Sequence, residues 1–138
     1  MASEIKSFTV NTQGNTDIID ITAQVGEIVA ECPFSEGTAT VFAPGSTAGI
    51  TTIEFESGAV ADFKAAFERI APEGIEYAHN ARWGDGNGHS HVRAALLGAS
   101  FSVPFADSRP LLGTWQQIVL VDFDNRPRER KIIVRTTS

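Results

Sequence analysis

The run from residue 115 to residue 123 alternates between two sets of side chains, and it constrains the fold of this chain most. One face carries Trp115, Gln117, Val119, Val121 and Phe123, and the other carries Gln116, Ile118, Leu120 and Asp122. Side chains that alternate in this way indicate a β-strand. Residues 101–105 and 130–136 also show strand patterns, and turn sequences separate the three segments. We therefore expect the last third of the chain to form an antiparallel meander.

Two amphipathic helices are predicted in the first half of the chain. Apolar side chains recur at helical spacing in a segment that ends at Pro33 and in another that ends at Pro72. These side chains are Val25, Ile28, Val29 and Cys32 in the first helix, and Val60, Phe63, Phe67 and Ile70 in the second. Thr22 and Ser57 are the predicted N-caps. A third, short helix is expected over residues 92–97.

Four further segments have the composition of strands, namely residues 5–10, 17–21, 38–43 and 49–55. The last two flank a Pro-Gly turn, so we expect them to be adjacent strands. Strands combined with two longer helices and one short helix predict an α+β fold made mostly of antiparallel sheet or sandwich. Residues 1–138 are expected to form a single domain.

Charge and composition exclude several classes of partner. The net charge is −6 and the pI is about 4.9, so we expect no binding to nucleic acid or to an anionic membrane. No stretch approaches the roughly 20 apolar residues of a membrane span, and the first residues lack the apolar run of a signal peptide. The single cysteine, Cys32, cannot form an internal disulfide and favours a reducing compartment. These features predict a cytoplasmic protein.

All three histidines of the chain lie between residues 77 and 98, around a glycine-rich segment. His79, His89 and His91 could together bind a divalent metal ion, because neutral imidazole is a common ligand. Alternatively, they hydrogen-bond the loop or line a substrate pocket without metal. His89 and His91 point the same way only in extended backbone, since two residues of a helix diverge by about 200°. Asp85, between them, is a candidate general base or orienting group.

Two other segments could hold an anion. The loop over residues 44–49 is small and polar, so its backbone N–H groups and the hydroxyls of Ser46 and Thr47 could bind one; the alternative is an ordinary hairpin turn. Five of the 11 basic residues lie near the C-terminus, at Arg126, Arg128, Arg130, Lys131 and Arg135. Guanidinium groups match phosphate oxygens, but basic residues also protect edge strands from aggregation. Both interpretations stay open on the sequence.

Several motifs in combination resemble the YjbQ family, an uncharacterised-protein family also described as secondary thiamine-phosphate synthases. They are Tyr77-Ala-His79-Asn80, the run from Asn87 to Gly98, Leu112-Gly-Thr-Trp-Gln116, Phe123-Asp-Asn-Arg-Pro-Arg128, and Thr47-Ala-Gly-Ile50 followed by Glu54. The resemblance spans about residues 5–135. It implies a compact α+β domain, a homotrimer with polar pockets near the subunit boundaries, and weak thiamine-phosphate synthase activity. That reaction joins a pyrimidine pyrophosphate to a thiazole phosphate and releases pyrophosphate.

The resemblance also suggests which side chains form the site. His79 and His91 match recurrent histidines of the family, whereas many members have a further histidine where this chain has Gly45. We expect His89 to replace it, so the predicted ligands of a divalent metal, zinc or magnesium, are His79, His89 and His91. The predicted catalytic residues are His79, Asp85 and His91. The predicted substrate-binding residues are Ser46, Thr47, Glu54, Asn80, Asn87, Arg93, Trp115, Gln116 and Arg126.

Two other functions compete with the synthase. The chain lacks a recognisable pair of nucleophile and base, which favours a homotrimer that binds a small phosphorylated metabolite or a metal without catalysis. A metal-assisted hydrolase is the third hypothesis. Arg93 or Arg126 would stabilise the departing pyrophosphate if the chain is a synthase.

Overall fold

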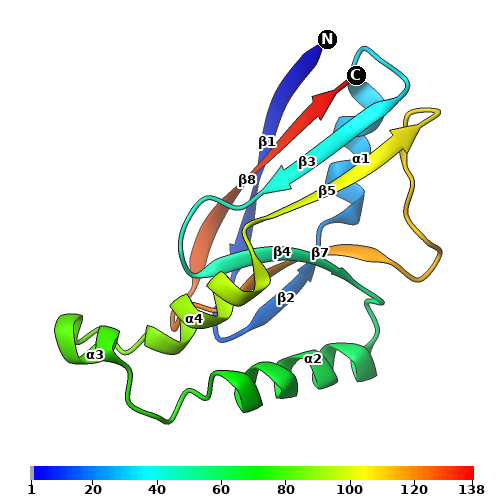
Figure 1. The fold of residues 1–138 in the computed structure, drawn as a ribbon. Coiled ribbons are helices and arrows are strands. Elements are labelled where there is room, and N and C mark those ends of the chain that lie inside the picture. Colours follow the sequence, from blue (N-terminus) through cyan, green and yellow to red (C-terminus); the bar gives the residue numbers. More distant parts are fainter. Residues whose placement is uncertain (1) are drawn as a thin grey trace.

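The computed structural model describes residues 2–138, and Figure 1 shows helices packed against antiparallel β-structure. In these residues eight strands form two sheets. The larger sheet has the order β1 (Ser3–Thr12), β8 (Arg128–Thr137), β3 (Gly37–Phe42), β5 (Ser100–Ala106), β6 (Arg109–Pro110). The smaller sheet has the order β2 (Asp17–Asp20), β7 (Gln117–Asp122), β4 (Ala48–Ile53). Every strand pairing is antiparallel, so the predicted α+β fold is confirmed.

Four helices accompany the strands in the described residues: α1 (Thr22–Glu31), α2 (Ser57–Ile70), α3 (Ala78–Trp83) and α4 (Gly88–Leu97). The periodicity predicts α1 and α2 correctly. The predicted N-caps are one residue late, because Ile21 precedes α1 and the Glu56 carboxylate accepts the Gly58 and Ala59 N–H groups at the start of α2. None of the described helices is long and apolar enough to cross a membrane.

Strand β7 lies at the centre of the core, because it is buried on both faces. Ile118 and Leu120 belong to a cluster with the apolar face of α1, and Val119 and Val121 belong to a second cluster with Phe67 of α2. All four β7 side chains have no exposed surface. At roughly 1.5–3 kcal/mol for each large apolar side chain removed from water, β7 is a principal source of stability.

The expected meander is wrong. β5 and β8 belong to the larger sheet, while β7, which lies between them in sequence, belongs to the smaller one. The expected pairing of residues 38–43 with 49–55 is also wrong, since β3 and β4 lie in different sheets. Because both faces of β7 are apolar, the strand needs a packed layer on each side, and a three-strand meander would leave one face open to water. The chain passes between the sheets several times, and two of these crossings, at the loop over residues 43–47 and after β7, lie close to the site described below.

Two short elements differ from the prediction around the histidines. α3 was not predicted; it ends at Gly84, whose φ of +73° is the left-handed conformation typical of a residue that stops a helix. α4 begins at Gly88 rather than at residue 92, so both His89 and His91 lie on it. This helical start decides how the histidines point.

Candidate functional site

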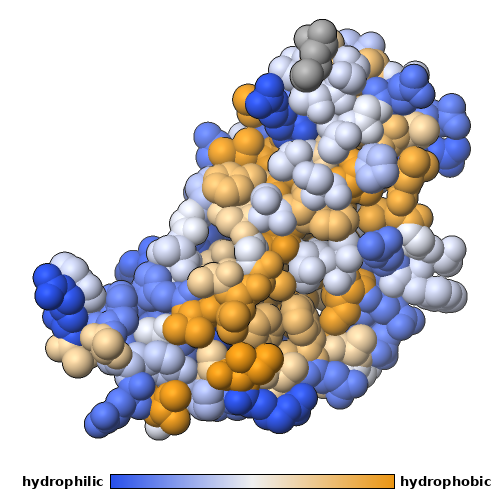
Figure 2. Space-filling model, viewed as in Figure 1, coloured by the Kyte–Doolittle hydropathy of each residue, from blue (hydrophilic) through white to orange (hydrophobic). Residues whose placement is uncertain are grey.

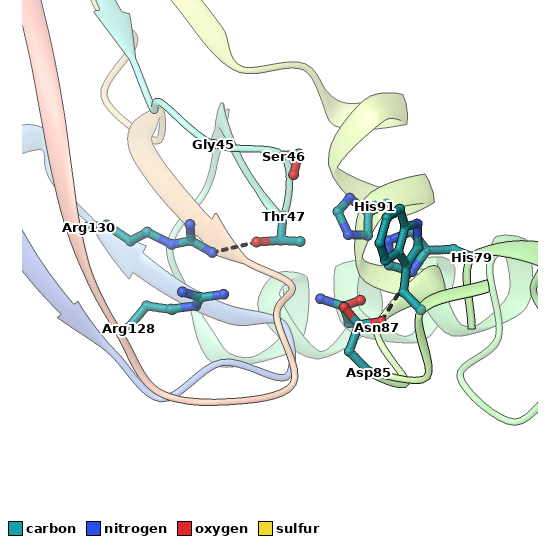
Figure 3. Close-up of a pocket in the computed structure, with 10 residues that line it drawn as sticks. Gly45, Ser46, Thr47, His79, Asp85, Asn87, His91, Arg128 and Arg130 are labelled. Carbon is teal, nitrogen blue, oxygen red and sulfur yellow. Dashed lines mark hydrogen bonds and ion pairs between the residues drawn. The ribbon is translucent and has the colours of Figure 1, made fainter. Parts of the chain in front are cut away.

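A pocket of about 500 Å³ opens between the loop that joins β3 to β4 and the helices α3 and α4. Figure 3 shows Arg128, Arg130 and Thr47 on one side of it and His79 and His91 on the other. The lining residues are Gly45, Ser46, Thr47, His79, Trp83, Asp85, Asn87, His91, Arg128 and Arg130. Segments far apart in sequence thus meet at one point where the chain changes sheet. Such a pocket with convergent polar groups is the expected place for a ligand.

Two of the three histidines face each other across the junction of α3 and α4. The ring centroids of His79 and His91 lie 4.3 Å apart, with 39° between the ring planes. Nδ1 of His79 lies 3.3 Å from Oδ1 of Asp85, within ion-pair distance, but the two groups are not aligned for a hydrogen bond. The predicted catalytic residues His79, Asp85 and His91 therefore share one pocket.

His89 does not join this pair. It lies two residues before His91 on α4, and the helical geometry turns it into the protein, where only 2% of its surface is exposed. Its ring packs 6.4 Å from that of Tyr77. Burial lowers the pKa of His89, and the positive charge of Arg93 lowers it further.

The predicted three-histidine metal set is therefore wrong in its geometry. Among residues 2–138 no three side chains of His, Cys, Asp or Glu come together as metal ligands would. The donors present do not make a preformed zinc or magnesium site, which would need at least three protein ligands for zinc or a shell of oxygens for magnesium. Metal uptake by His79 and His91 alone stays a prediction.

The opposite wall of the pocket is held by two buried aspartates, each paired with an arginine. Arg130 donates from Nε and Nη2 to the two oxygens of Asp122, at 2.8 and 2.9 Å. Arg128 donates from Nε and Nη2 to Oδ2 of Asp124, at 2.8 and 2.6 Å. Such forked contacts fix the planes of both guanidinium groups. The wall is thus rigid before any ligand arrives.

Hydrogen bonds keep both aspartates ionised. Burial alone would raise the pKa of Asp124, but hydrogen bonds from Arg128, the Asn125 N–H and Asn87 outweigh it and lower the pKa to about 2. Burial likewise opposes ionisation of Asp122, and hydrogen bonds from Arg130 and Thr12 lower its pKa below the usual value. The two carboxylates compensate most of the positive charge of the wall.

Gly45, Ser46 and Thr47, which line the pocket, carry backbone N–H groups without a partner in the described chain. Nη1 of Arg130 also has no acceptor there, and it lies 3.2 Å from the place where a Cβ on Gly45 would stand. Gly45 has a φ of +120°, which a side chain would strain. The expected alternative, a hairpin turn, is wrong because the loop joins strands of different sheets.

Arg93 is structural rather than substrate-binding. It is 5% exposed, and its Nε, Nη1 and Nη2 donate to the Ala71 carbonyl, Thr16 Oγ1 and Glu68 Oε2, at 2.9, 2.9 and 2.6 Å. The side chain does not line the pocket with the histidines. Arg93 instead fastens α4 to the end of α2 and to the turn before β2.

Five other predicted binding residues also lie outside this pocket, namely Glu54, Asn80, Trp115, Gln116 and Arg126. Glu54, Trp115 and Gln116 lie near the opposite end of the β4–β7 pair, where Gln116 donates to Thr52 at 3.1 Å. Trp115 precedes β7 and is 73% exposed, so it is neither core nor pocket. Arg126 and Asn80 are absent from the lining as well.

Asn80 has a local structural role, because its Oδ1 accepts the Gly88 N–H at 2.8 Å and so ties α3 to the start of α4. Sequence reasoning did not select Trp83, which lines the pocket from α3. Only the formation of α3 places Trp83 one helical turn from His79, and that helix has no apolar periodicity to reveal it. Arg128 and Arg130 were noticed as charges, but their pairing with aspartates depends on sheet register.

The comparisons with known proteins agree on one family. The family described as UPF0047 protein YjbQ-like matches residues 6–138. A UPF0047 protein of Archaeoglobus fulgidus is 36% identical over 128 residues, which cover 93% of this chain and 97% of that protein. The UPF0047 protein YugU of Bacillus subtilis is 33% identical over 132 residues, covering 95% and 97% of the two chains.

Solved structures show the same fold. A hypothetical protein of Aeropyrum pernix K1 superposes with a TM-score of 0.89 at 30% identity, covering 98% of each chain. A protein of unknown function from Sulfolobus solfataricus P2 gives a TM-score of 0.88 at 29% identity, also over 98% of each chain. The family match spans nearly the whole sequence, and the fold agrees with it. The chain therefore belongs to the UPF0047 family of YjbQ-like proteins, a family of unknown function.

Proposed function

We propose that the pocket binds the phosphate group of a small phosphorylated metabolite. The observation that carries this proposal is the run of three backbone N–H groups at Gly45, Ser46 and Thr47 that, like Nη1 of Arg130 beside them, find no acceptor among residues 2–138. Successive N–H groups in a turn form a concave site for an anion, and a guanidinium nitrogen adds a charge-assisted hydrogen bond. The site thus offers donors on a rigid frame, as phosphate recognition requires.

The charges around the pocket indicate that it attracts a phosphate only at short range. Asp122 and Asp124 already compensate Arg130 and Arg128, and the whole chain carries a net charge of −6. Attraction of the phosphate therefore comes from local N–H dipoles and Arg130 Nη1, not from a field that steers anions over a long distance. The imidazoles of His79 and His91, across the pocket, can donate hydrogen bonds to the same ligand.

Catalysis would use the histidine side of the pocket. His79 lies within ion-pair distance of Asp85, whose charge would stabilise a protonated imidazole, and the ring of His91 lies beside that of His79 at a tilt of 39°. In the synthase reaction that the family resemblance suggests, a thiazole nitrogen bonds to the methylene carbon of the pyrimidine pyrophosphate. The bond from that carbon to the pyrophosphate oxygen breaks, and the leaving pyrophosphate takes the electron pair. The donors of the loop would stabilise its growing charge.

Substituting Gly45 with alanine tests the binding step. We expect Gly45→Ala to weaken the binding of inorganic pyrophosphate at least about tenfold in calorimetry. The added Cβ would lie 3.2 Å from Nη1 of Arg130, and alanine at a φ of +120° would cost about 1–3 kcal/mol of backbone strain. Gly26→Ala on α1 is the matched control, since no atom lies within 4 Å of its added Cβ. Equal affinity in the wild type and both variants would contradict the proposal.

A turnover assay separates the synthase from a binding protein. With both thiamine-phosphate precursors, we expect pyrophosphate release that is lost in His79→Ala while pyrophosphate binding persists. Binding without turnover in the wild type would favour the alternative of a non-catalytic binding protein. Loss of a phosphatase activity on adding a chelator would instead support the metal-assisted hydrolase.

Elemental analysis of untagged protein tests metal uptake by the remaining histidine pair. Stoichiometric zinc that is lost in His91→Ala would establish a metal site that contains His91 and is completed by ligands other than His89. A metal-free wild type would instead favour direct contact between the histidines and the substrate. Because His89 is buried away from the pair, His89→Gln should leave any bound metal unchanged.

A cytoplasmic homotrimer is the proposed assembly, as the family resemblance implies. Apolar surface supports a subunit contact: Val92 and Leu96 on α4 are 40% and 60% exposed. Figure 2 shows apolar atoms gathered over the middle of the face that carries α4 and β4. Light scattering should give three times the monomer mass of 14.8 kDa, and a Leu96→Glu variant should lower it.

A further inference from the structure

A second cavity, of about 300 Å³, adjoins the pocket that we propose for phosphate. The two cavities share Gly45, Ser46 and His91 in their linings, and Figure 3 shows Ser46 and His91 on the two sides of the gap between the loop and α4. The remaining lining residues of the second cavity, which we call the alanine slot, are Ala48, Ala94, Ala95, Gly98 and Ala99. A ligand whose phosphate is held by the loop therefore has room to extend past His91 into the alanine slot.

Small residues along α4 keep the alanine slot open. His91, Ala94 and Ala95 lie on one face of the helix, and Gly98 follows at its end. Ala94 is 6% exposed and lies deep in the slot, whereas Ala95 is exposed at its rim. No atom lies within 4 Å of the place where a Cβ on Gly98 would stand. Because alanine and glycine have no side-chain torsions, no rotamer change of these residues can close the space.

The alanine slot offers few partners for a polar group. Apart from the residues that it shares with the larger pocket, its lining has no polar or charged side chain. The carbonyl oxygens of Gly98 and Ala99 already accept the backbone N–H groups of Ile50 and Ala43, at 3.1 and 2.9 Å. A hydroxyl group placed in the slot would lose its hydrogen bonds to water without equivalent replacements, whereas a methylene group would gain free energy by leaving water.

The proposed phosphate site and the alanine slot meet at Gly45, which lines both cavities. Arg130 is only 9% exposed, yet its Nη1 has no acceptor among residues 2–138 and lies 3.2 Å from the place where a Cβ on Gly45 would stand. A phosphate bound there would have a charged donor on one side and the slot on the other. Ligand sites commonly combine a few convergent polar groups with an apolar lining in this way.

We infer that the ligand is a phosphate ester of a short alkyl group, and that this alkyl group lies in the alanine slot. The inference rests on the proposed phosphate site and names the class of ester that it selects. Each methylene group that leaves water should raise the affinity about fourfold. Sugar phosphates bind less well, because their hydroxyl groups would lie against alanine methyl groups.

Calorimetry on the wild type tests the inference with inorganic phosphate, methyl phosphate, butyl phosphate and glycerol phosphate. We expect butyl phosphate to bind at least about tenfold more tightly than methyl phosphate, and glycerol phosphate to bind no more tightly than methyl phosphate. Equal affinities for butyl and methyl phosphate, or tighter binding of glycerol phosphate than of butyl phosphate, would overturn the inference while leaving the phosphate site intact. Binding of none of the compounds would overturn the proposed function and this inference with it.

Filling the alanine slot supplies the second arm of the test. Ala95→Leu places a larger side chain in the slot from an exposed position of α4, so butyl phosphate should lose its advantage over methyl phosphate. Ala65→Leu, at an exposed position of α2 that lines neither cavity, is the matched control and should keep the wild-type preference. A preference for butyl phosphate that persists in Ala95→Leu would overturn the inference.

Alanine methyl resonances give a readout that needs no variant. In isotope-labelled wild type, the methyl groups of Ala95 and Ala99 should shift more with butyl phosphate than with inorganic phosphate, because only the ester reaches the slot. The methyl resonance of Ala65 should stay in place with both compounds. Equal shifts of the Ala95 and Ala99 methyl groups with the two compounds would place the alkyl group elsewhere and overturn the inference.

Discussion

His89 and His91 show how two neighbouring residues of one type come to have different roles. The sequence analysis anticipated that a helix would separate them, but it placed the helix start too late to apply that rule. α4 begins at Gly88, where an added Cβ would lie 2.5 Å from Cβ of Tyr77, so the start depends on close packing rather than on a capping motif. The pairing of His79 with His91 in the pocket could therefore not be predicted without knowing this contact.

The stability of the protein should report the buried His89. Its pKa is lowered in the fold, so below about pH 6.5 the unfolded chain binds a proton that the folded chain resists. The free energy of unfolding should therefore decrease as the pH is lowered below about 6.5, by up to about 1.4 kcal/mol per pH unit from this residue. Urea denaturation at pH 6.5 and 5.5 should show a smaller decrease for His89→Gln than for the wild type. The same decrease in both proteins would mean that His89 is not held neutral.

At the scale of elements, periodicity predicted the helices that carry long apolar stripes. α1 and α2 end where their prolines predict, and Val29 and Phe67 lie in the core as expected. α3 has six residues and no buried side chain, so no apolar stripe could reveal it. α4 was predicted only from residue 92 on, because its first turn buries the polar side chains of His89 and Ser90 and so shows no apolar stripe. Polar residues with structural contacts are thus the main source of error here.

Arg93 should prove essential for stability and dispensable for binding. Arg93→Met leaves the Ala71 carbonyl and Thr16 without their donor, so we expect a loss of about 2–4 kcal/mol in the free energy of unfolding. The Glu68 side chain is 57% exposed, and the control Glu68→Gln should lose less than about 1 kcal/mol. Denaturant titration measures both losses. Pyrophosphate affinity at a temperature where Arg93→Met remains folded should equal that of the wild type; a selective loss of affinity would return Arg93 to the binding site.

At the scale of the whole molecule, strand patterns gave the elements but not their arrangement. The alternation over residues 115–123 correctly marked β7, but sequence neighbours were assumed to be sheet neighbours. The assumption fails because Asp122 at the end of β7 and Asp124 just after it pair with arginines of β8 in the other sheet. Asp124 and Arg128 are four positions apart and Asp122 and Arg130 eight, but whether they meet depends on how the chain crosses from one sheet to the other after β7. The pocket wall that carries Arg128 and Arg130 therefore depends on the order of the strands in the two sheets.

Acid should weaken the ion pairs of Asp122 and Asp124 with the arginines of β8 and so lower the free energy of unfolding. The Asp124 pKa of about 2 lies below its usual value of 3.8, so its stabilisation is complete above about pH 4 and is lost as pH falls toward 2. The shift corresponds to about 2 kcal/mol. Asp124→Asn should lose about that amount at pH 7 and show a flatter decline in acid. Asp62→Asn, on the exposed side of α2, should follow the wild-type curve. Parallel acid curves for Asp124→Asn and the wild type would show that the pairs contribute little.

The most direct measurement of the phosphate site is a titration of isotope-labelled protein with inorganic phosphate, followed through the backbone amide resonances. The amides of Gly45, Ser46 and Thr47 should move most and saturate together, because their N–H groups have no acceptor within the described protein. The Gly26 amide on α1 should not move. Unchanged loop amides, or larger shifts elsewhere on the molecule, would contradict the claim that this loop binds phosphate.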